Sequence, residues 1–254
     1  MVDELKNAKY VSIDLETTSV NPMLAEIVGI SLSYNKNSAF YIPILYPEKK
    51  KNNFGSNDLE VALSIMKEFL ENKDIRKIGQ NIKYDYIIFK KSGVELTSIE
   101  DTMLLSYTLD AGNNRHNMDT LSELHLGHKT ISYKDLVGTG KKQLKFSEVD
   151  LDKATEYAAE DADVTLRLYQ ILSERVEKEK LNKIYEIFEK PMIKILSKLE
   201  TCGVKVDDNY LKVLSKKFEA RLIKIEKEIY QISGKEFNIG SPKQLGEIIY
   251  NDLK

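Results

Sequence analysis

Cysteine is nearly absent from this 254-residue sequence, which contains only Cys202. A single thiol cannot form a disulfide within the chain, and chains without disulfides are typical of reducing compartments, so we expect a cytoplasmic protein. The first ten residues are charged and contain no apolar run, which argues against a secretory signal there. No segment approaches the roughly 20 consecutive apolar residues that a membrane-spanning helix needs.

An excess of charge of one sign is also missing, because 38 Lys and Arg residues stand against 40 Asp and Glu residues, for a net charge of −2. The chain therefore has no overall positive field, and any contact with nucleic acid must come from local patches. Hydrophobic residues make up 42% of the sequence, which is ordinary for a soluble globular protein. The length suits one large domain, or one domain with an appendage.

The first half of the chain alternates between strand-like and helix-like patterns. The predicted strands cover 9–15, 26–35, 38–45 and 75–81, and the predicted helices cover 57–72 and 82–93. The short turn between the second and third strands requires antiparallel pairing, so we expect the first three strands to form a meander. The order of elements predicts an α/β fold, a mixed sheet flanked by helices.

Helical patterns dominate 101–128, and a long ordered loop is predicted over 128–150. One long helix is then expected to run to residue 179, with Asp150 or Asp152 near its N-cap. For the earlier helix over 57–72, Asn57 or Asp58 is the expected N-cap.

The character of the sequence changes near residue 185, which predicts a first domain over 1–185 and a helical appendage over 186–254. Apolar residues recur in the appendage at spacings of three and four, forming a stripe. The stripe consists of Leu211, Leu214, Phe218, Leu222, Ile225, Ile229 and Ile232. Little of the remaining sequence could cover this stripe, so we expect it to bind a partner.

The first candidate catalytic residues are in "SIDLETTS", where Asp14 and Glu16 end the first predicted strand. Residues two apart on a strand point to the same face, so two carboxylates project side by side. Exposed acids at a strand end would give the same pattern. A third acid, Asp85 in "GQNIKYD", lies one turn into a predicted helix, where an acid often serves only to stabilise the helix dipole.

The stretch "EYAAEDAD" crowds acids onto the long predicted helix. Tyr157 and Asp161 are four residues apart and therefore share a face. Asp163 lies on another face, where we expect it to pair with Arg167. Glu160 flanks the face of Tyr157 and can contact either solvent or a neighbour of the site.

Together these segments offer four carboxylates, Asp14, Glu16, Asp85 and Asp161, and no set of cysteine or histidine ligands. A site made only of oxygen ligands suits Mg²⁺ or Mn²⁺. Four acids can hold two divalent ions about 4 Å apart, an arrangement that catalyses displacement at phosphorus. The hydroxyl of Tyr157 keeps its proton at neutral pH, because the pKa of tyrosine is about 10, so it cannot serve as a base. We expect it to orient the attacking water.

The segments "IDLET", "IGQNIKYD" and "YAAEDAD" resemble the three motifs of the DEDD exonucleases, in the tyrosine subclass found in bacterial family A DNA polymerases. The segments "FYIPI" and "IFEKPMIKILSKLETCGVKVD" extend the resemblance over most of the chain. It implies a ribonuclease-H-like fold and proofreading removal of nucleotides from the 3′ end of DNA. By the same resemblance, Asp14, Glu16 and Asp161 would hold one metal ion, and Asp14 and Asp85 the second. Tyr157 would position the water.

The resemblance also implies a set of substrate-binding residues. Asn81 and Arg115 would contact the terminal strand, and Tyr133 would stack on a base. Val20 would stand where the family has a larger apolar wedge. Ordinary packing would explain Tyr133 equally well. The remaining candidates adjoin the motifs; they are Thr17, Gln80, Lys83 and Tyr84.

The three histidines, His116, His125 and His128, are expected to be structural. No acidic or nucleophilic residue is paired with any of them in the sequence, as it would be in a catalytic pair.

Three functions remain open at this stage. The first is a two-metal 3′–5′ exodeoxyribonuclease acting on single-stranded or frayed DNA ends. The second is an exoribonuclease similar to ribonuclease D, for which the same acids would serve. The third is a non-catalytic DNA-binding or interaction module. The appendage resembles the beginning of a polymerase domain toward its thumb, so the partner expected on 211–232 is the rest of such a domain, whose active site this sequence lacks.

Overall fold

The computed structural model describes residues 4–5, 8–46 and 58–253. The chain divides into two compact units, over 1–202 and 203–254. The boundary between the units lies beyond the predicted domain boundary, because residues 186–202 belong to the first unit. The extent of the two domains stays a prediction. No helix in the described part of the chain is long and apolar enough to cross a membrane.

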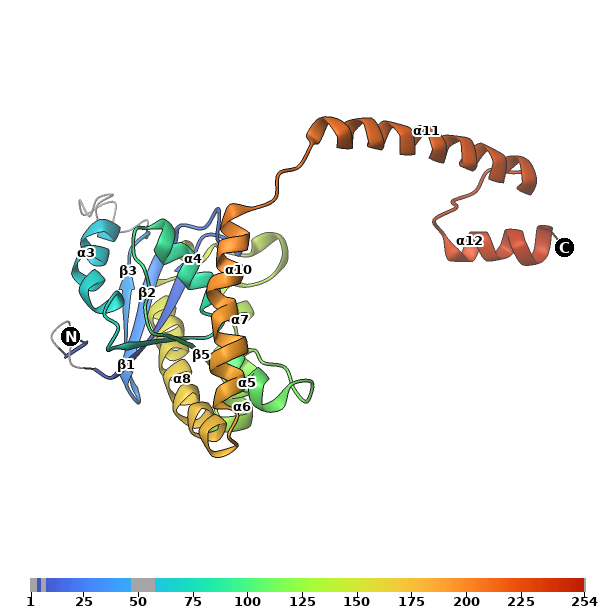
Figure 1. The fold of residues 1–254 in the computed structure, drawn as a ribbon. Coiled ribbons are helices and arrows are strands. Elements are labelled where there is room, and N and C mark those ends of the chain that lie inside the picture. Colours follow the sequence, from blue (N-terminus) through green and yellow to red (C-terminus); the bar gives the residue numbers. More distant parts are fainter. Residues whose placement is uncertain (1–3, 6–7, 47–57, 254) are drawn as a thin grey trace. The chain divides into compact units, whose positions relative to one another are not determined.

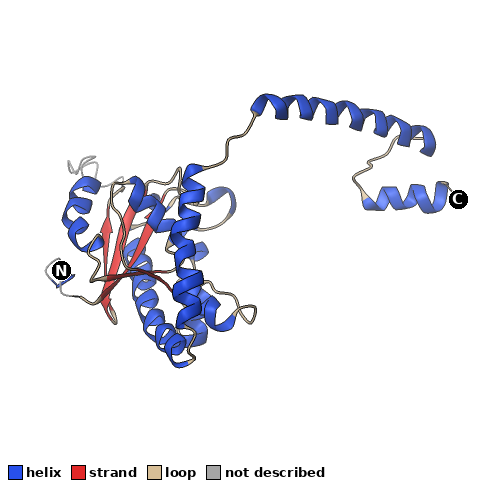
Figure 2. Ribbon diagram, viewed as in Figure 1, coloured by secondary structure: helices blue, strands red, loops and turns tan. Residues whose placement is uncertain are grey.

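The first unit contains a five-stranded sheet and the helices that cover it (Figures 1 and 2). The strands are β1 (Tyr10–Thr17), β2 (Ile27–Asn35), β3 (Ser38–Pro43), β4 (Arg76–Gly79) and β5 (Ile99–Asp101). The helices are α3 (Asp58–Leu70), α4 (Lys83–Lys91), α5 (Thr102–Asp110), α6 (Met118–Leu126), α7 (Tyr133–Val137), α8 (Leu151–Lys178), α9 (Asn182–Ile184) and α10 (Lys190–Cys202). Short turns of other helix types are η1 (Gly140–Lys142), η2 (Phe146–Glu148) and η3 (Tyr185–Glu189).

The sheet has the strand order β3-β2-β1-β4-β5. Antiparallel pairing joins β1 to β2 and β2 to β3, which confirms the predicted meander. Parallel pairing joins β1 to β4 and β4 to β5, each after a helical crossover. The result is the mixed sheet flanked by helices that the sequence predicts, with a ribonuclease-H-like arrangement.

The two faces of β1 differ in chemistry because its residues alternate. Val11, Ile13 and Leu15 are buried in the hydrophobic cluster that β1 forms with α3 and α4. The even-numbered positions face α8, and the hydroxyl of Ser12 donates a 2.6 Å hydrogen bond to the carbonyl of Ala162. Figure 1 shows α4 and α8 on opposite sides of the sheet.

Small side chains let α8 pack closely on the sheet. Ala154, Ala158 and Ala162 recur every four residues and are fully buried. Asp150 accepts a hydrogen bond from the backbone N–H of Lys153 and is the N-cap, which decides between the two predicted alternatives. Close packing brings the acids of α8 within reach of those on β1.

Two differences from the predicted elements have physical causes. The sequence pattern does not reveal β5, since three residues are too few to show alternation. The predicted loop over 128–150 contains α7, η1 and η2, which are too short to show helical periodicity. Of the two N-cap candidates for α3, Asp58 is its first residue, and Asn57 lies outside the described residues.

Lys77 on β4 is a fully buried lysine that binds the chain just after α3. Its ammonium donates to the carbonyls of Asn72 at 2.5 Å and Ile75 at 2.6 Å, and to the hydroxyl of Thr97 at 3.2 Å. Burial lowers the pKa of Lys77 to about 8, so the charged form still prevails at neutral pH. The ammonium thus provides a donor for backbone oxygens in the interior.

Replacing Lys77 by methionine should lower the free energy of unfolding by about 3 kcal/mol, because these carbonyls lose their donor. Urea unfolding followed by circular dichroism measures the loss. Lys67→Met is the matched control, since the Lys67 side chain is 51% exposed and donates to the carbonyl of Gly93 from the surface. The control should change stability by less than about 0.5 kcal/mol, and equal losses in the two variants would contradict this role for Lys77.

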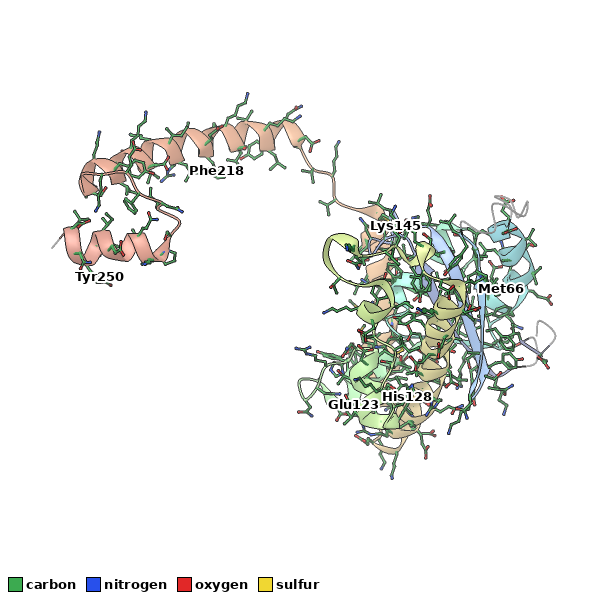
Figure 3. All side chains as sticks on the ribbon, turned by 180° about the vertical axis from the view of Figure 1, so that it is seen from behind. Met66, Glu123, His128, Lys145, Phe218 and Tyr250 are labelled. Carbon is green, nitrogen blue, oxygen red and sulfur yellow. The ribbon has the colours of Figure 1, made fainter. Side chains whose placement is uncertain are left out.

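The second unit consists of α11 (Asp208–Ser233), α12 (Pro242–Glu247) and the turn η4 (Ile248–Asp252). Helix α11 has no buried residue, and Figure 3 marks Phe218 on it and Tyr250 in η4. Leu211, Phe218 and Leu222 are between 49% and 65% exposed and line a shallow groove. The predicted apolar stripe is therefore uncovered in the described chain.

Candidate active site

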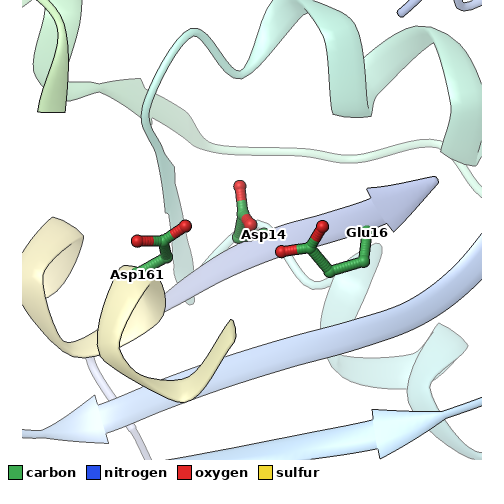
Figure 4. A group of neighbouring side chains, drawn as sticks. All are labelled: Asp14, Glu16 and Asp161. Atoms are coloured by element: carbon green, nitrogen blue, oxygen red, sulfur yellow. The ribbon is translucent and has the colours of Figure 1, made fainter. Parts of the chain in front are cut away.

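Three carboxylates meet toward the C-terminal end of β1. Asp14 and Glu16 project from one face of the strand, and Asp161 reaches them from α8. One oxygen of each lies within 4.8 Å of the others. Figure 4 shows Asp14 between the other two side chains, whose carboxylates turn toward it.

The fourth predicted acid, Asp85, is buried in the first turn of α4. Burial, and then the charge of the neighbouring Asp14 carboxylate, hold the pKa of Asp85 well above its usual range. Among the described residues, the close cluster of three does not include Asp85. The structure thus brings all four acids to one region, with Asp14 shared between a group of three and a pair.

The electrostatics of this region are unfavourable without a cation. Burial raises the pKa of Asp14 to about 6. Burial, and then the charges of Asp14, Asp161 and Asp85, hold the pKa of Glu16 well above its usual range. Burial and the charge of Asp14 do the same for Asp161. A divalent cation would relieve both the desolvation and the repulsion, so this all-oxygen donor set fits Mg²⁺ or Mn²⁺.

Tyr157 lies one turn before Asp161 on α8. Its hydroxyl donates a hydrogen bond to the Asp161 carboxylate. Burial and the nearby acids raise the pKa of Tyr157, so this hydroxyl keeps its proton at neutral pH. It can exchange hydrogen bonds beside the acids, but it cannot act there as a base.

A groove of about 420 Å³ opens beside Glu16. Its walls come from the end of β1 and the loop after it, from the segment before α4, and from α4 and α7. The lining residues are Leu15, Glu16, Thr17, Thr18, Ser19, Val20, Asn81, Tyr84 and Tyr133. The structure therefore gathers five of the eight predicted substrate-binding residues around one hollow next to the acids.

The loop that forms one wall of the groove is held by Tyr84. The Tyr84 hydroxyl lies 2.5 Å from Oγ1 of Thr17 and donates to the carbonyl of Ser19. The Val20 side chain follows directly and is 96% exposed. A fixed backbone thus presents an apolar side chain to solvent at the mouth of the groove.

The other three predicted substrate residues do not line the groove. Gln80 is engaged within the protein, since its amide nitrogen donates to the carbonyl of His116 at 2.7 Å and its oxygen accepts from Thr102 at 2.5 Å. Lys83 forms an ion pair with Glu200 of α10. Arg115 is exposed. Their roles toward a substrate stay predictions.

Tyr133 belongs to an aromatic cluster that reaches the acids. Its ring stacks on Phe146 with a centroid distance of 6.5 Å and an interplanar angle of 6°. It also meets the ring of Tyr157 edge-on at 6.0 Å. The Tyr133 side chain is nevertheless 44% exposed, so packing covers one part of it and leaves another open to the groove.

Asp101 is a buried acid that the sequence pattern does not single out. Its carboxylate accepts backbone N–H bonds from Asn81 at 3.1 Å and Ile82 at 2.9 Å, and it caps α5 through Met103 and Leu104. It thereby holds Asn81, whose φ of 59° is uncommon for a residue with a side chain. The only signal for this role in the sequence is an acid directly before a predicted helix.

Tyr41 on β3 is a second residue near the acids that sequence reasoning missed. Burial and the hydrogen bond with Tyr46 raise the pKa of Tyr41, and the charges of Glu16 and Asp14 add to the rise. Its ring lies over Gly29, the register partner of Glu16, where an added Cβ would be 2.1 Å from the Tyr41 hydroxyl oxygen. The glycine within a strand is the signal, because it leaves room for a close neighbour.

Asp163 and Glu160 of α8 each contact a loop. Asp163 pairs with Arg167 at 3.4 Å, which confirms the predicted pair, and it also accepts from the backbone N–H of Asn37 at 2.5 Å. Glu160 contacts His128 at 2.7 Å, so it is not a solvent-facing residue.

The contacts described for the other two histidines, His116 and His125, do not involve the four acids. His116 exchanges a hydrogen bond with Ser106 at 2.8 Å and packs edge-on against Tyr107. For His125, burial lowers the pKa. The contacts of His116 suit the structural role expected for it.

A cluster of carboxylates at the C-terminal end of the central strand of a ribonuclease-H-like sheet is typical of metal-dependent nucleases. A family model described as a 3′–5′ exonuclease matches residues 1–177. This chain therefore belongs to the 3′–5′ exonuclease family of the family A DNA polymerases, and it is a nuclease.

Two relatives with similar sequences are both DNA polymerases I. The chain is 42% identical to the enzyme of Rhizobium leguminosarum over 96% of its own length and 25% of that protein. It is 37% identical to the enzyme of Pseudomonas aeruginosa, over 98% of the chain and 28% of that protein. The chain thus spans about a quarter of the length of these relatives.

Solved structures share the fold. One is the polymerase domain of Pol1 from M. smegmatis in complex with a DNA primer-template and dNTP. The alignment covers all of this chain and 39% of the Pol1 chain, with a TM-score of 0.75 and 18% sequence identity. Another is Brucella melitensis NrnC with bound Mg²⁺. The alignment covers 79% of this chain and 90% of the NrnC chain, with a TM-score of 0.58 and 21% sequence identity.

Proposed function

We propose that this chain removes nucleotides one at a time from the 3′ ends of single-stranded or frayed DNA, using two divalent metal ions, as a proofreading nuclease does. The observation that carries the proposal is the shared position of Asp14. It belongs to a cluster with Glu16 and Asp161 and is also a neighbour of Asp85. A carboxylate common to two groups suits an acid that bridges two ions.

Each acid and Tyr157 would have a specific role in this reaction. Asp14, Glu16 and Asp161 would hold one ion, and Asp14 and Asp85 the other. When bound, such ions supply a hydroxide at neutral pH and stabilise charge on the leaving oxygen. Tyr157, already beside Asp161, would hydrogen-bond the attacking water and aim it at the phosphorus.

The groove beside Glu16 would hold the terminal nucleotides. Tyr133 offers a partly exposed ring for stacking, and Val20 an exposed apolar contact for a base. Asn81, Thr17 and Tyr84 offer polar groups in the same hollow. Gln80, Lys83 and Arg115 do not line this hollow and would contact the strand farther from its end.

The proposal includes a larger assembly. The relatives are DNA polymerases I, of which this chain spans about a quarter. We propose that the exposed stripe over 211–232 packs against the rest of a polymerase domain, and that the enzyme works in the cytoplasm.

A ribonuclease-D-like exoribonuclease is the second candidate, because the same acids would hydrolyse RNA. A non-catalytic module is the third. Sequence similarity to DNA polymerases I favours DNA, and the intact set of four acids favours catalysis.

One assay separates the three functions. The chain is incubated with Mg²⁺ or Mn²⁺ and a single strand labelled at its 5′ end, as DNA and as RNA of the same sequence. We expect a ladder of DNA products shortened stepwise from the 3′ end, and none when the metal is chelated. Preferential shortening of RNA would support the second candidate. The absence of cleavage with either metal would contradict both enzymatic functions.

A further inference from the structure

Glu160 ties helix α8 to the segment that leads into α7. One of its carboxylate oxygens is 2.7 Å from Nε2 of His128, and the other accepts the backbone N–H of Ile131 at 2.6 Å. Both oxygens are therefore used by a segment about 30 residues away in the sequence. Glu160 directly precedes Asp161, so one turn of α8 serves the acid cluster and this segment together.

The same segment has further anchors on α6. The hydroxyl of Thr130 donates to Asp119 at 2.8 Å, and that of Ser122 donates to the carbonyl of His128 at 2.8 Å. These bonds fix the beginning of the segment. Glu160 is the anchor that connects it to the helix of the active site.

Tyr133 stands two residues after Ile131, at the first position of α7. Its ring is placed between Phe146 and Tyr157 on one side and the groove on the other. The backbone that leads into this ring is the one that Glu160 holds. Loss of the Glu160 anchor would let the segment move away from α8 and carry the ring with it.

We infer that Glu160 is a positioning residue for substrate binding, which holds the segment over 128–132 so that Tyr133 faces the groove. The inference rests on the proposed function only in that the groove binds the DNA end. Glu160 itself touches neither the metal nor the strand. His128 supports Glu160 from the segment, which gives that histidine a specific task.

The kinetic test compares Glu160→Ala, Tyr133→Ala and the double variant on single-stranded DNA. Each single change should raise KM about tenfold with little change in kcat, since loss of one base stack weakens binding by about that factor. The double variant should be no worse than Tyr133→Ala, because both changes remove the same contact. Additive effects, or an unchanged KM in Glu160→Ala, would overturn the inference.

Asp163→Ala is the matched control. Asp163 also lies on α8 and also accepts a backbone N–H from a loop, that of Asn37. It should leave KM unchanged, which separates the position of Tyr133 from general support of α8. His128→Gln, a milder change, should raise KM less than Glu160→Ala does. A fall in thermal stability without a change in KM would assign Glu160 to folding alone.

A second readout needs no cleavage. The sequence contains no tryptophan, so Tyr133→Trp introduces a single fluorescent reporter at the groove. Adding Glu160→Ala should make this tryptophan more accessible to quenching by acrylamide, and adding Asp163→Ala should not. Equal quenching in all three proteins would overturn the inference. If the unaltered chain failed to cleave DNA, the proposed function would fall while this measurement still decided the role of Glu160.

Discussion

Asp161→Ala should reduce the rate of removal of 3′-terminal nucleotides by about 10³-fold or more. The Asp161 oxygen lies within 4.8 Å of those of Asp14 and Glu16, so its loss breaks the ligand set of one ion. A bound ion stabilises the transition state by several kcal/mol, and each 1.4 kcal/mol or so corresponds to a factor of ten in rate. The same change also removes the hydrogen-bond partner of Tyr157.

Asp163→Ala provides the comparison within the same helical turn. Asp163 contacts Arg167 and the backbone of Asn37, away from the cluster. Its removal should keep the rate within a factor of about two. The measurement is the initial rate of shortening of a 5′-labelled DNA strand at saturating Mg²⁺. Comparable losses in both variants would falsify the assignment of Asp161 to the metal, provided that both proteins stay folded.

Divalent metal should stabilise the protein strongly at pH 8 and weakly at pH 5. The folded-state pKa of Asp14 is raised from 3.8 to about 6, so between these values the folded state binds more protons than the unfolded state. The stability of the metal-free protein must then fall as pH rises through this window. For Asp14 alone the loss is about 3 kcal/mol, at 1.36 kcal/mol or so per pKa unit. Above this pH range, bound metal ions neutralise the carboxylates in place of the lost protons. Within the range, metal ions and protons compete for the same carboxylates.

Thermal unfolding with Mn²⁺ or with a chelator measures this effect. A recovery of about 3 kcal/mol would raise the midpoint by roughly 6–12 °C at pH 8 for a chain of this size. Asp14→Ala should abolish most of the metal-dependent shift, because Asp14 serves both groups of acids, and Asp163→Ala should keep it. A shift of equal size at both pH values would contradict the exchange of protons for metal.

The sequence predicts much of this arrangement where the signal is local. The alternation in β1 places Asp14 and Glu16 on one face, and the spacing of four places Tyr157 on the side of Asp161. Both relations depend only on the geometry of a strand or a helix, and the structure has both.

Relations between distant segments are beyond such patterns. Lys83 pairs with Glu200, 117 residues away, and no periodicity connects the two. Asp101 accepts from Asn81 across a crossover between parallel strands. The direct contacts of Glu160 arise in the same way, because the segment over 128–132 returns to α8 only in the folded chain.

Three acids within four residues of α8 connect the helix to three separate parts of the domain. Glu160 holds the segment before α7, Asp161 joins the acids of β1, and Asp163 holds the turn between β2 and β3. Each successive residue turns about 100° around a helix, so an inserted or deleted residue near 160 would rotate part of this set away from its targets at once. The three contacts together therefore constrain the length of this stretch, even where single residues in it can be replaced.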